Sequence, residues 1–166
     1  MKSNNGISGI QYMRAHGNSV GPTHRPMLTG LISGIAAAFP ALAVRVLFGT
    51  LTSEASAIGQ NTATAGLIAV LIFAGSGLLY AFIFQRAANE MCSGWLLGIS
   101  YGFLLWVVGP VALWNLTAGT PLAVGVEALG LFASHLAYGL TLGAVYPLVN
   151  RLTQSRLRGA ERDERE

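Results

Sequence analysis

The sequence predicts an all-α integral membrane protein, a four-helix bundle in which every long helix crosses the bilayer. Of the 166 residues, 52% are hydrophobic and only 10% are charged, whereas a soluble domain carries about a quarter charged residues. Four apolar stretches reach the length of roughly 20 residues that crosses about 30 Å of hydrocarbon. Nine of the ten basic residues and five of the seven acidic ones gather in three short polar segments outside these stretches. Together these observations exclude a water-soluble domain.

The spans are predicted at about 27–49, 65–85, 94–114 and 128–148. Because backbone polar groups in lipid must be satisfied within one element, we expect each span to be a helix. Only two spans contain a residue that can be charged near neutral pH, Arg45 in the first and His135 in the fourth.

The spans form one domain, residues 27–150, between an N-terminal tail, 1–26, and a charged C-terminal tail, 151–166. We expect the first tail to be flexible and the second to extend the fourth helix by a turn or two. Lysine and arginine outside the spans lie only in these tails and in the turn with Arg86. By the positive-inside rule both termini are cytoplasmic in a multi-pass protein of the plasma membrane.

The two halves of the chain resemble each other. Four residues of the first span recur 64 positions later in the third: Gly30, Gly34, Ile35 and Phe39 return as Gly94, Gly98, Ile99 and Phe103. The second and fourth spans agree less well, at an offset of 58 that aligns Tyr80 with Tyr138. Each half is a hairpin that enters from the same side, which predicts two parallel repeats.

Small residues spaced three or four apart form stripes on these helices. Such stripes let helix backbones approach closely in lipid, where no hydrophobic force drives helices together. We interpret them as packing faces within the bundle, and a homodimer face is the alternative. The predicted packing residues are Gly30, Gly34, Ala38, Gly94, Gly98, Gly102, Gly139 and Gly143.

Arg45 continues the Gly34 stripe and is therefore predicted to point into the bundle. A charge inside the membrane costs roughly 2.5–3.5 kcal/mol on insertion scales and usually finds a partner. Glu127 is the partner we predict, and Glu54 is a second candidate at the same depth. Two alternatives remain open: Arg45 extends to the headgroups, or it belongs to a substrate or ion site.

His135 shares a stripe with Gly139 and Gly143. A neutral imidazole bonded to another helix is the plain interpretation, and proton relay is another. Ligation of haem or a chlorophyll-type pigment is a third, although no cofactor is predicted. Two-histidine ligation within one chain fails, because the other histidines lie in the N-terminal tail. No metal site is expected, and the single cysteine, Cys92, excludes an internal disulfide.

Pro40 and Pro110 interrupt the first and third spans, and matched breaks in repeated helices are typical of transporters. Pro40 and Pro110 do not match at the offset of 64. We therefore interpret Gly109-Pro110 as a local bend near the end of the third span.

Three motifs resemble the YagU-like group of small bacterial inner-membrane proteins: Gly30-x-x-x-Gly34 with Ala38-Phe39, Trp95-Leu-Leu-Gly98, and Ser134-His135-Leu-Ala-Tyr138-Gly139. The resemblance covers residues 28–150 and implies a four-helix protein of the bacterial inner membrane. It matches the histidine of the last span to His135. The chain departs from the group in having short outer loops, and the resemblance implies no reaction.

These features favour a non-enzymatic accessory or structural subunit that associates through its small-residue faces, with itself or with a larger membrane complex. The alternative is a small oligomeric transporter or channel with Arg45, Glu127 and His135 in its outer half. A haem- or pigment-binding subunit that uses His135 is the third hypothesis. The sequence lacks paired carboxylates, a nucleophile with its base, and HExxH. Lipids are expected partners, and nucleic acid is not.

Overall fold

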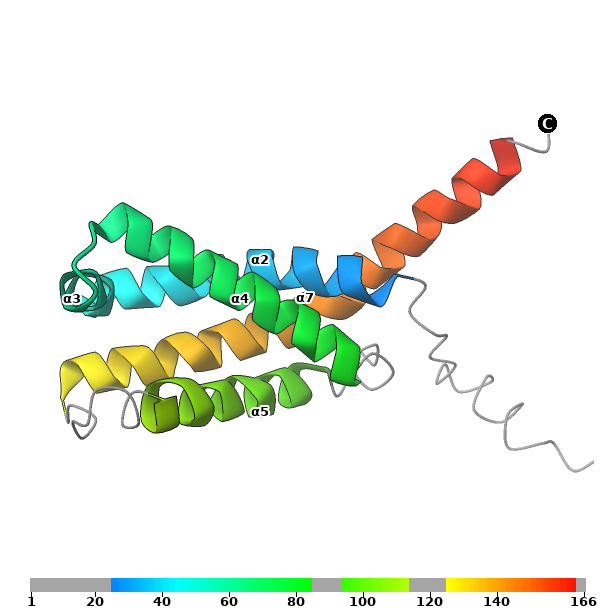
Figure 1. The fold of residues 1–166 in the computed structure, drawn as a ribbon. Coiled ribbons are helices and arrows are strands. Elements are labelled where there is room, and N and C mark those ends of the chain that lie inside the picture. The colour runs from blue at the N-terminus through cyan, green and yellow to red at the C-terminus, as the bar shows by residue number, and fades with distance from the viewer. Residues whose placement is uncertain (1–24, 85–93, 114–124, 164–166) are drawn as a thin grey trace, which may run out of the picture.

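The computed structural model describes residues 25–84, 94–113 and 125–163, with side chains up to Thr153 (Figure 1). The described residues are helical apart from short connections, and four long apolar helices pack as a bundle. The elements are α2 (Pro26–Leu47), α3 (Thr50–Ala57), α4 (Thr62–Phe84), α5 (Gly94–Trp106), the π-helix η2 (Val107–Leu113) and α7 (Val126–Asp163). The all-α fold is confirmed.

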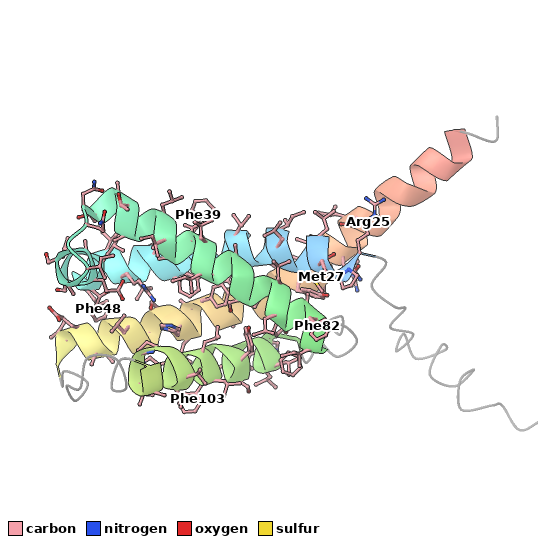
Figure 2. All side chains as sticks on the ribbon, in the orientation of Figure 1. Arg25, Met27, Phe39, Phe48, Phe82 and Phe103 are labelled. Carbon is pink, nitrogen blue, oxygen red and sulfur yellow. The ribbon has the colours of Figure 1, made fainter. Side chains whose placement is uncertain are left out.

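Four segments have the length and hydropathy of membrane spans: Pro26–Leu47, Thr62–Phe84, Gly94–Ala112 and Val126–Thr153. Each overlaps a predicted span. The chain is therefore built as a multi-pass membrane protein. Its side chains agree with lipid surroundings, because Phe39, Phe82 and Phe103 point outward from three different helices in Figure 2.

The first connection contains a helix that the sequence analysis missed. The chain leaves α2 through Gly49, whose φ of 70° lies in the left-handed region that favours glycine. The eight residues of α3 follow at once. Thr50 fixes this corner, because its hydroxyl donates to the carbonyl oxygen of Arg45 at 3.1 Å. A helix this short carries little periodic signal, and five of its eight residues are polar.

The last helix is longer than predicted. It begins at Val126 and continues to Asp163, more than three turns past Asn150 rather than one or two. Six of the thirteen residues of this extension are charged, and Figure 1 shows it projecting from the bundle beside the start of α2. The described ends of the chain therefore lie at one end of the bundle, and α3 lies at the other, which we call the α3 end.

Other expectations concern residues outside the described ranges. These are most of the N-terminal tail, the turn with Arg86, and Cys92.

Helices α2 and α7 form the centre of the bundle. Helix α2 packs closely against α4 and α7, and α7 packs closely against α5. The backbones of α4 and α5 make few close contacts, and they meet through long side chains: the hydroxyl of Tyr101 donates to the carbonyl oxygen of Ser76 at 2.8 Å. In Figure 1, α4 and α5 converge at the end of the bundle opposite α3 and diverge towards the α3 end. This divergence positions the site described below.

Glycines set the distance between the helices of each hairpin. A Cβ on Gly77 would collide with the carbonyl oxygen of Gly30 and lie 2.7 Å from the Cα of Gly34. The second hairpin uses the same arrangement, because a Cβ on Gly143 would collide with the carbonyl oxygen of Gly94 and lie 3.0 Å from the Cα of Gly98. Gly102 and Gly139 approach each other in the same way. The predicted small-residue faces therefore pack within the chain, as backbone contact between helices in lipid requires.

These contacts also change the alignment of the two halves. Gly77 and Gly143 have equivalent neighbours, and they lie 66 residues apart in the sequence. At this offset Tyr80 corresponds to Tyr146, and both side chains are fully buried. The predicted offset of 58 differs from the one that the contacts give, because sequence similarity between apolar helices does not fix which residue occupies the crossing point.

A buried stripe on each central helix carries polar groups into the interior. Every fourth residue of α2 is buried from Thr29 to Arg45, and every fourth residue of α7 from Ser134 to Asn150. The Nε of Arg45 donates to the Ser134 hydroxyl at 3.3 Å, which joins the two stripes at the α3 end. Tyr138 links α7 to α4, since its hydroxyl donates to the carbonyl oxygen of Phe73 at 2.7 Å.

The predicted bend at Gly109-Pro110 is a π-helix. Pro110 lies within η2, which continues directly from α5. Proline has no N–H to donate to the preceding turn, so a regular α-helix would leave a carbonyl oxygen without its bond there. A π-turn is one known way of accommodating such a break, and π-turns occur frequently at functional sites.

Candidate functional site

Arg45 enters the bundle from the last turn of α2. Only 9% of the residue is exposed, as its place on the buried stripe predicts. Its Nη1 donates to both oxygens of the Glu54 carboxylate, at 2.8 and 3.1 Å. Its Cζ lies 5.2 Å from the centre of the Phe73 ring, within cation–π range. The guanidinium is therefore held by a carboxylate from α3, a hydroxyl from α7 and an aromatic face from α4.

The predicted pair of Arg45 with Glu127 is not formed. Glu54, the second candidate of the sequence analysis, takes that position. Glu127 instead accepts a hydrogen bond at 2.8 Å from the hydroxyl of Ser53. The reason is the helix α3, which begins directly after Gly49 and brings Glu54 back over the end of α2. Depth in the membrane did not distinguish the two glutamates, because the corner at Gly49 decides which one faces Arg45.

The Glu54 carboxyl lies outside the spans and is partly buried, with 29% of its side chain exposed. Burial disfavours its charged form and raises its pKa above the ordinary value, and the neighbouring charge and hydrogen bond of Arg45 oppose that rise. The carboxyl therefore accepts a proton more readily than a solvated glutamate does.

His135 is buried on α7 next to Ser134. Its Nδ1 lies 2.8 Å from the carbonyl oxygen of Leu131, one turn back in the same helix. A carbonyl oxygen can only accept, so Nδ1 carries the proton and a neutral ring keeps its lone pair on Nε2. The sequence analysis expected a neutral imidazole that bonds to another helix, whereas the hydrogen bond of His135 lies within α7. Phe73 packs against the ring edge to face, with centroids 5.8 Å apart.

A half-open pocket of about 560 Å³ lies at the α3 end. Volumes of roughly 300–1,000 Å³ are typical of small-molecule sites. The pocket occupies the place where α4 and η2 diverge. Its lining is mostly apolar, with the charged groups gathered on the side of α3. The lining residues that matter below are Arg45, Ser53, Glu54, Ala65, Ile68, Ala69, Ile72, Pro110, Glu127, Leu131 and His135.

The structure thus brings together three residues that the transporter hypothesis placed in one half of the membrane. Arg45, Glu127 and His135 all line this one pocket. The apolar wall from α4 and η2 was not predicted, since Ile68 carries no signal beyond hydrophobicity and Pro110 was interpreted only as a local bend. Ser53 and Ser134 were not predicted as site residues either. Ser134 could have been found, because its spacing of four from Tyr138 and Leu142 places it on the buried face of α7.

The pocket combines an apolar wall with a charged end. Its groups can bind an amphipathic molecule by burying its apolar part and neutralising its polar part. Among the described residues, no three histidine, cysteine, aspartate or glutamate side chains come close enough together to hold a metal ion.

Fold and site together define a class: an all-α, multi-pass membrane protein with a half-open pocket at one end of its bundle. No family model matches this sequence, and neither a curated protein nor a solved structure matches it. The resemblance to the YagU-like group stays a prediction, so the function has to be argued from the site.

Proposed function

We propose that this chain is a non-enzymatic membrane protein that binds a small lipid-soluble molecule in the pocket at the α3 end. Binding there would be the first step of transport across the membrane. This agrees with the alternative hypothesis from the sequence, a small transporter. The pocket carries the proposal, because Arg45, Glu127 and His135 share its lining with an apolar wall. A purely structural subunit has no need of a pocket that gathers its few charged residues.

The apolar wall supports entry of the ligand from the lipid rather than from water. Ile68 and Ile72 line the pocket and are also partly exposed on the outer surface of α4, at 39% and 65%. A molecule dissolved in the hydrocarbon therefore meets apolar side chains all the way to the polar groups. Transfer from lipid costs such a molecule little, since its apolar part stays in apolar surroundings throughout.

Charge placement supports the orientation with both termini in the cytoplasm. Arg25 and Arg151 lie at the end of the bundle opposite α3, whereas Glu54 and Glu127 lie at the α3 end. The positive-inside rule assigns the arginine-rich end to the cytoplasm. The pocket then belongs to the outer half of the membrane, and for a bacterial protein this is the plasma membrane.

The glycine crossings support duplication of one hairpin. Gly77 and Gly143 occupy equivalent crossings, and Tyr80 and Tyr146 follow each by three residues. Two such hairpins side by side would be the parallel repeats predicted from the sequence. Glu54 has no counterpart of its kind at the offset of 64, where Ala118 stands. The carboxylate that pairs with Arg45 therefore has no equivalent in the second repeat, although α7 of that repeat also lines the pocket.

The accessory-subunit hypothesis relied on the small-residue faces for association with a partner, and these faces are occupied within the chain. Gly34 and Gly98 face glycines of their own chain, so association with a partner would need a different face. Co-purification from native membranes with a stoichiometric partner would favour that hypothesis. A pigment- or haem-binding subunit would be coloured, and visible absorption of the purified protein tests it.

A matched pair of tryptophan variants tests ligand binding. Ile72 and Leu71 are adjacent on α4 and about equally exposed, at 65% and 63%, but only Ile72 lines the pocket. The neutral probe N-phenyl-1-naphthylamine becomes fluorescent in apolar sites. We expect saturable binding to the purified protein above a detergent blank, lost in I72W and kept in L71W. Equal binding by both variants, or no saturable binding by the native protein, would refute the proposal.

A further inference from the structure

The charges of the pocket indicate which molecules it selects, and this inference rests on the proposed function. Three charged residues line the pocket: Arg45, Glu54 and Glu127. One cation against two carboxylates leaves a formal charge of −1, with His135 neutral. In a site walled by apolar side chains, one uncompensated charge has a large effect on selectivity, because the effective dielectric constant there is far below that of water.

The positive charge is already used within the protein. The Nη1 of Arg45 donates to both oxygens of Glu54, and its Nε donates to Ser134. An anionic ligand at Arg45 would compete with Glu54 for the guanidinium. Separating a largely buried pair is costly, because it leaves the carboxylate without its cation. The pocket is therefore poorly suited to an anion.

The negative charge of Glu127 is in contrast available. Its Oε1 accepts one hydrogen bond from Ser53, and among the described residues it pairs with no cation within 4.0 Å. Ser53 orients this carboxylate without neutralising it. Glu127 is exposed at the mouth of the pocket, so a ligand can reach it without unfolding α3 or α7.

The apolar wall specifies the rest of the ligand. Ile68, Ile72, Pro110 and Leu131 offer hydrocarbon surface on three elements, and the volume of about 560 Å³ admits a molecule with two or more rings. We infer that the pocket selects lipophilic cations, with the apolar body against this wall and the positive group beside Glu127.

Two ions of matched size and opposite charge test this inference. Tetraphenylphosphonium and tetraphenylborate have nearly the same shape, so a difference in their binding reports charge. Their binding to the purified protein in a nonionic detergent is measured by equilibrium dialysis against detergent blanks. We expect the native protein to prefer the cation by about tenfold or more, as one unit charge at low dielectric implies.

Variants assign the preference to Glu127. E127Q should lose most of the preference, and E127K should reverse it in favour of the borate. E161Q is the control, because Glu161 lies on α7 about 50 Å beyond Glu127 at 1.5 Å per residue. It should behave like the native protein. Circular dichroism verifies that each variant is folded.

The outcomes separate this inference from the proposed function. Saturable binding of the neutral naphthylamine without any preference between the two ions would overturn the inference and leave the proposed function standing. Preference for the cation that persists unchanged in E127Q would also overturn the inference, because the selectivity would arise elsewhere. If neither the neutral probe nor either ion binds saturably, both proposals fail.

Discussion

Arg45 is the residue on which the α3 end of the bundle depends. Its charge is removed from water, and three groups replace the lost hydration: the Glu54 carboxylate, the Ser134 hydroxyl and the Phe73 ring. These groups come from three helices, so the guanidinium fixes their relative positions as well as its own charge. A buried ion pair often adds little net stability, but the loss of one member is costly because the other stays unpaired.

Replacement of Arg45 by alanine should therefore destabilise the protein in a pH-dependent way. Burial raises the pKa of Glu54, and without the opposing charge of Arg45 the pKa rises further. A carboxyl whose pKa is higher in the folded state contributes stability at low pH, and this contribution is lost as pH rises through the folded pKa. We expect R45A to lose about 3 kcal/mol at about pH 7.5, and part of this loss should be recovered near pH 5.

Thermal unfolding in nonionic detergent, followed by circular dichroism, measures this effect. R151A is a suitable control, because Arg151 is exposed on α7 beyond the pocket. Its stability relative to the native protein should not depend on pH in this range. An equal loss for R45A at both pH values would show that Glu54 is not the group that responds.

At the scale of elements, backbone contact between glycines determines how the helices pair. Gly77 fits between Gly30 and Gly34, and Gly139 fits between Gly98 and Gly102. Each helix is apolar on nearly all sides, so hydrophobicity alone does not select the face that packs. The absence of side chains at the crossings does select it, because only there can the helix backbones come into contact.

Two glycines on one helix give a test of this packing. A Cβ on Gly77 would lie 2.7 Å from the Cα of Gly34, whereas Gly75 has no atom within 4 Å of such a Cβ. We expect G77A to lose about 2 kcal/mol through overpacking. G75A should be unchanged or more stable by up to about 1 kcal/mol, since alanine favours the helix. Unfolding of both variants in mixed detergent micelles measures the difference. Equal stabilities would argue against the crossing.

At the scale of the whole molecule, the charged groups gather at the two ends of the bundle. The described termini and the arginine-rich extension of α7 lie at one end, and the pocket lies at the other. Because α4 leaves the bundle axis towards the α3 end, the pocket opens where the two hairpins separate. The candidate site therefore lies at the end of the bundle away from the described termini.

Labelling of introduced cysteines tests the orientation. In a background with Cys92→Ser, Gln60→Cys lies in the connection after α3 and Arg25→Cys lies at the start of α2, and both positions are exposed. A membrane-impermeant maleimide should label Q60C in intact cells and R25C only after lysis. Labelling of R25C in intact cells, with Q60C protected, would invert the orientation and move the pocket to the cytoplasmic half.

Particular residues show how far the sequence could predict this structure. The inward direction of Arg45 followed from its spacing to Gly34 and Ala38, since helix geometry alone fixes which residues share a face. Its partner did not follow. Glu54 and Glu127 have the same charge and depth, and only the left-handed corner at Gly49 distinguishes them. The offset of the second repeat failed similarly, because it depends on contact between Gly143 and Gly94.

The sequence by itself determined the number of spans, their helical form and the faces that pack. These follow from transfer of apolar side chains into lipid and from hydrogen bonding within each helix, both of which are local properties of a segment. Only the tertiary structure decided that Arg45, Glu127 and His135 meet at one pocket, with an apolar wall supplied by α4 and η2. That arrangement depends on the angle at which α4 crosses α2 and diverges from η2, and a crossing angle is set by contacts between helices rather than by the composition of either one.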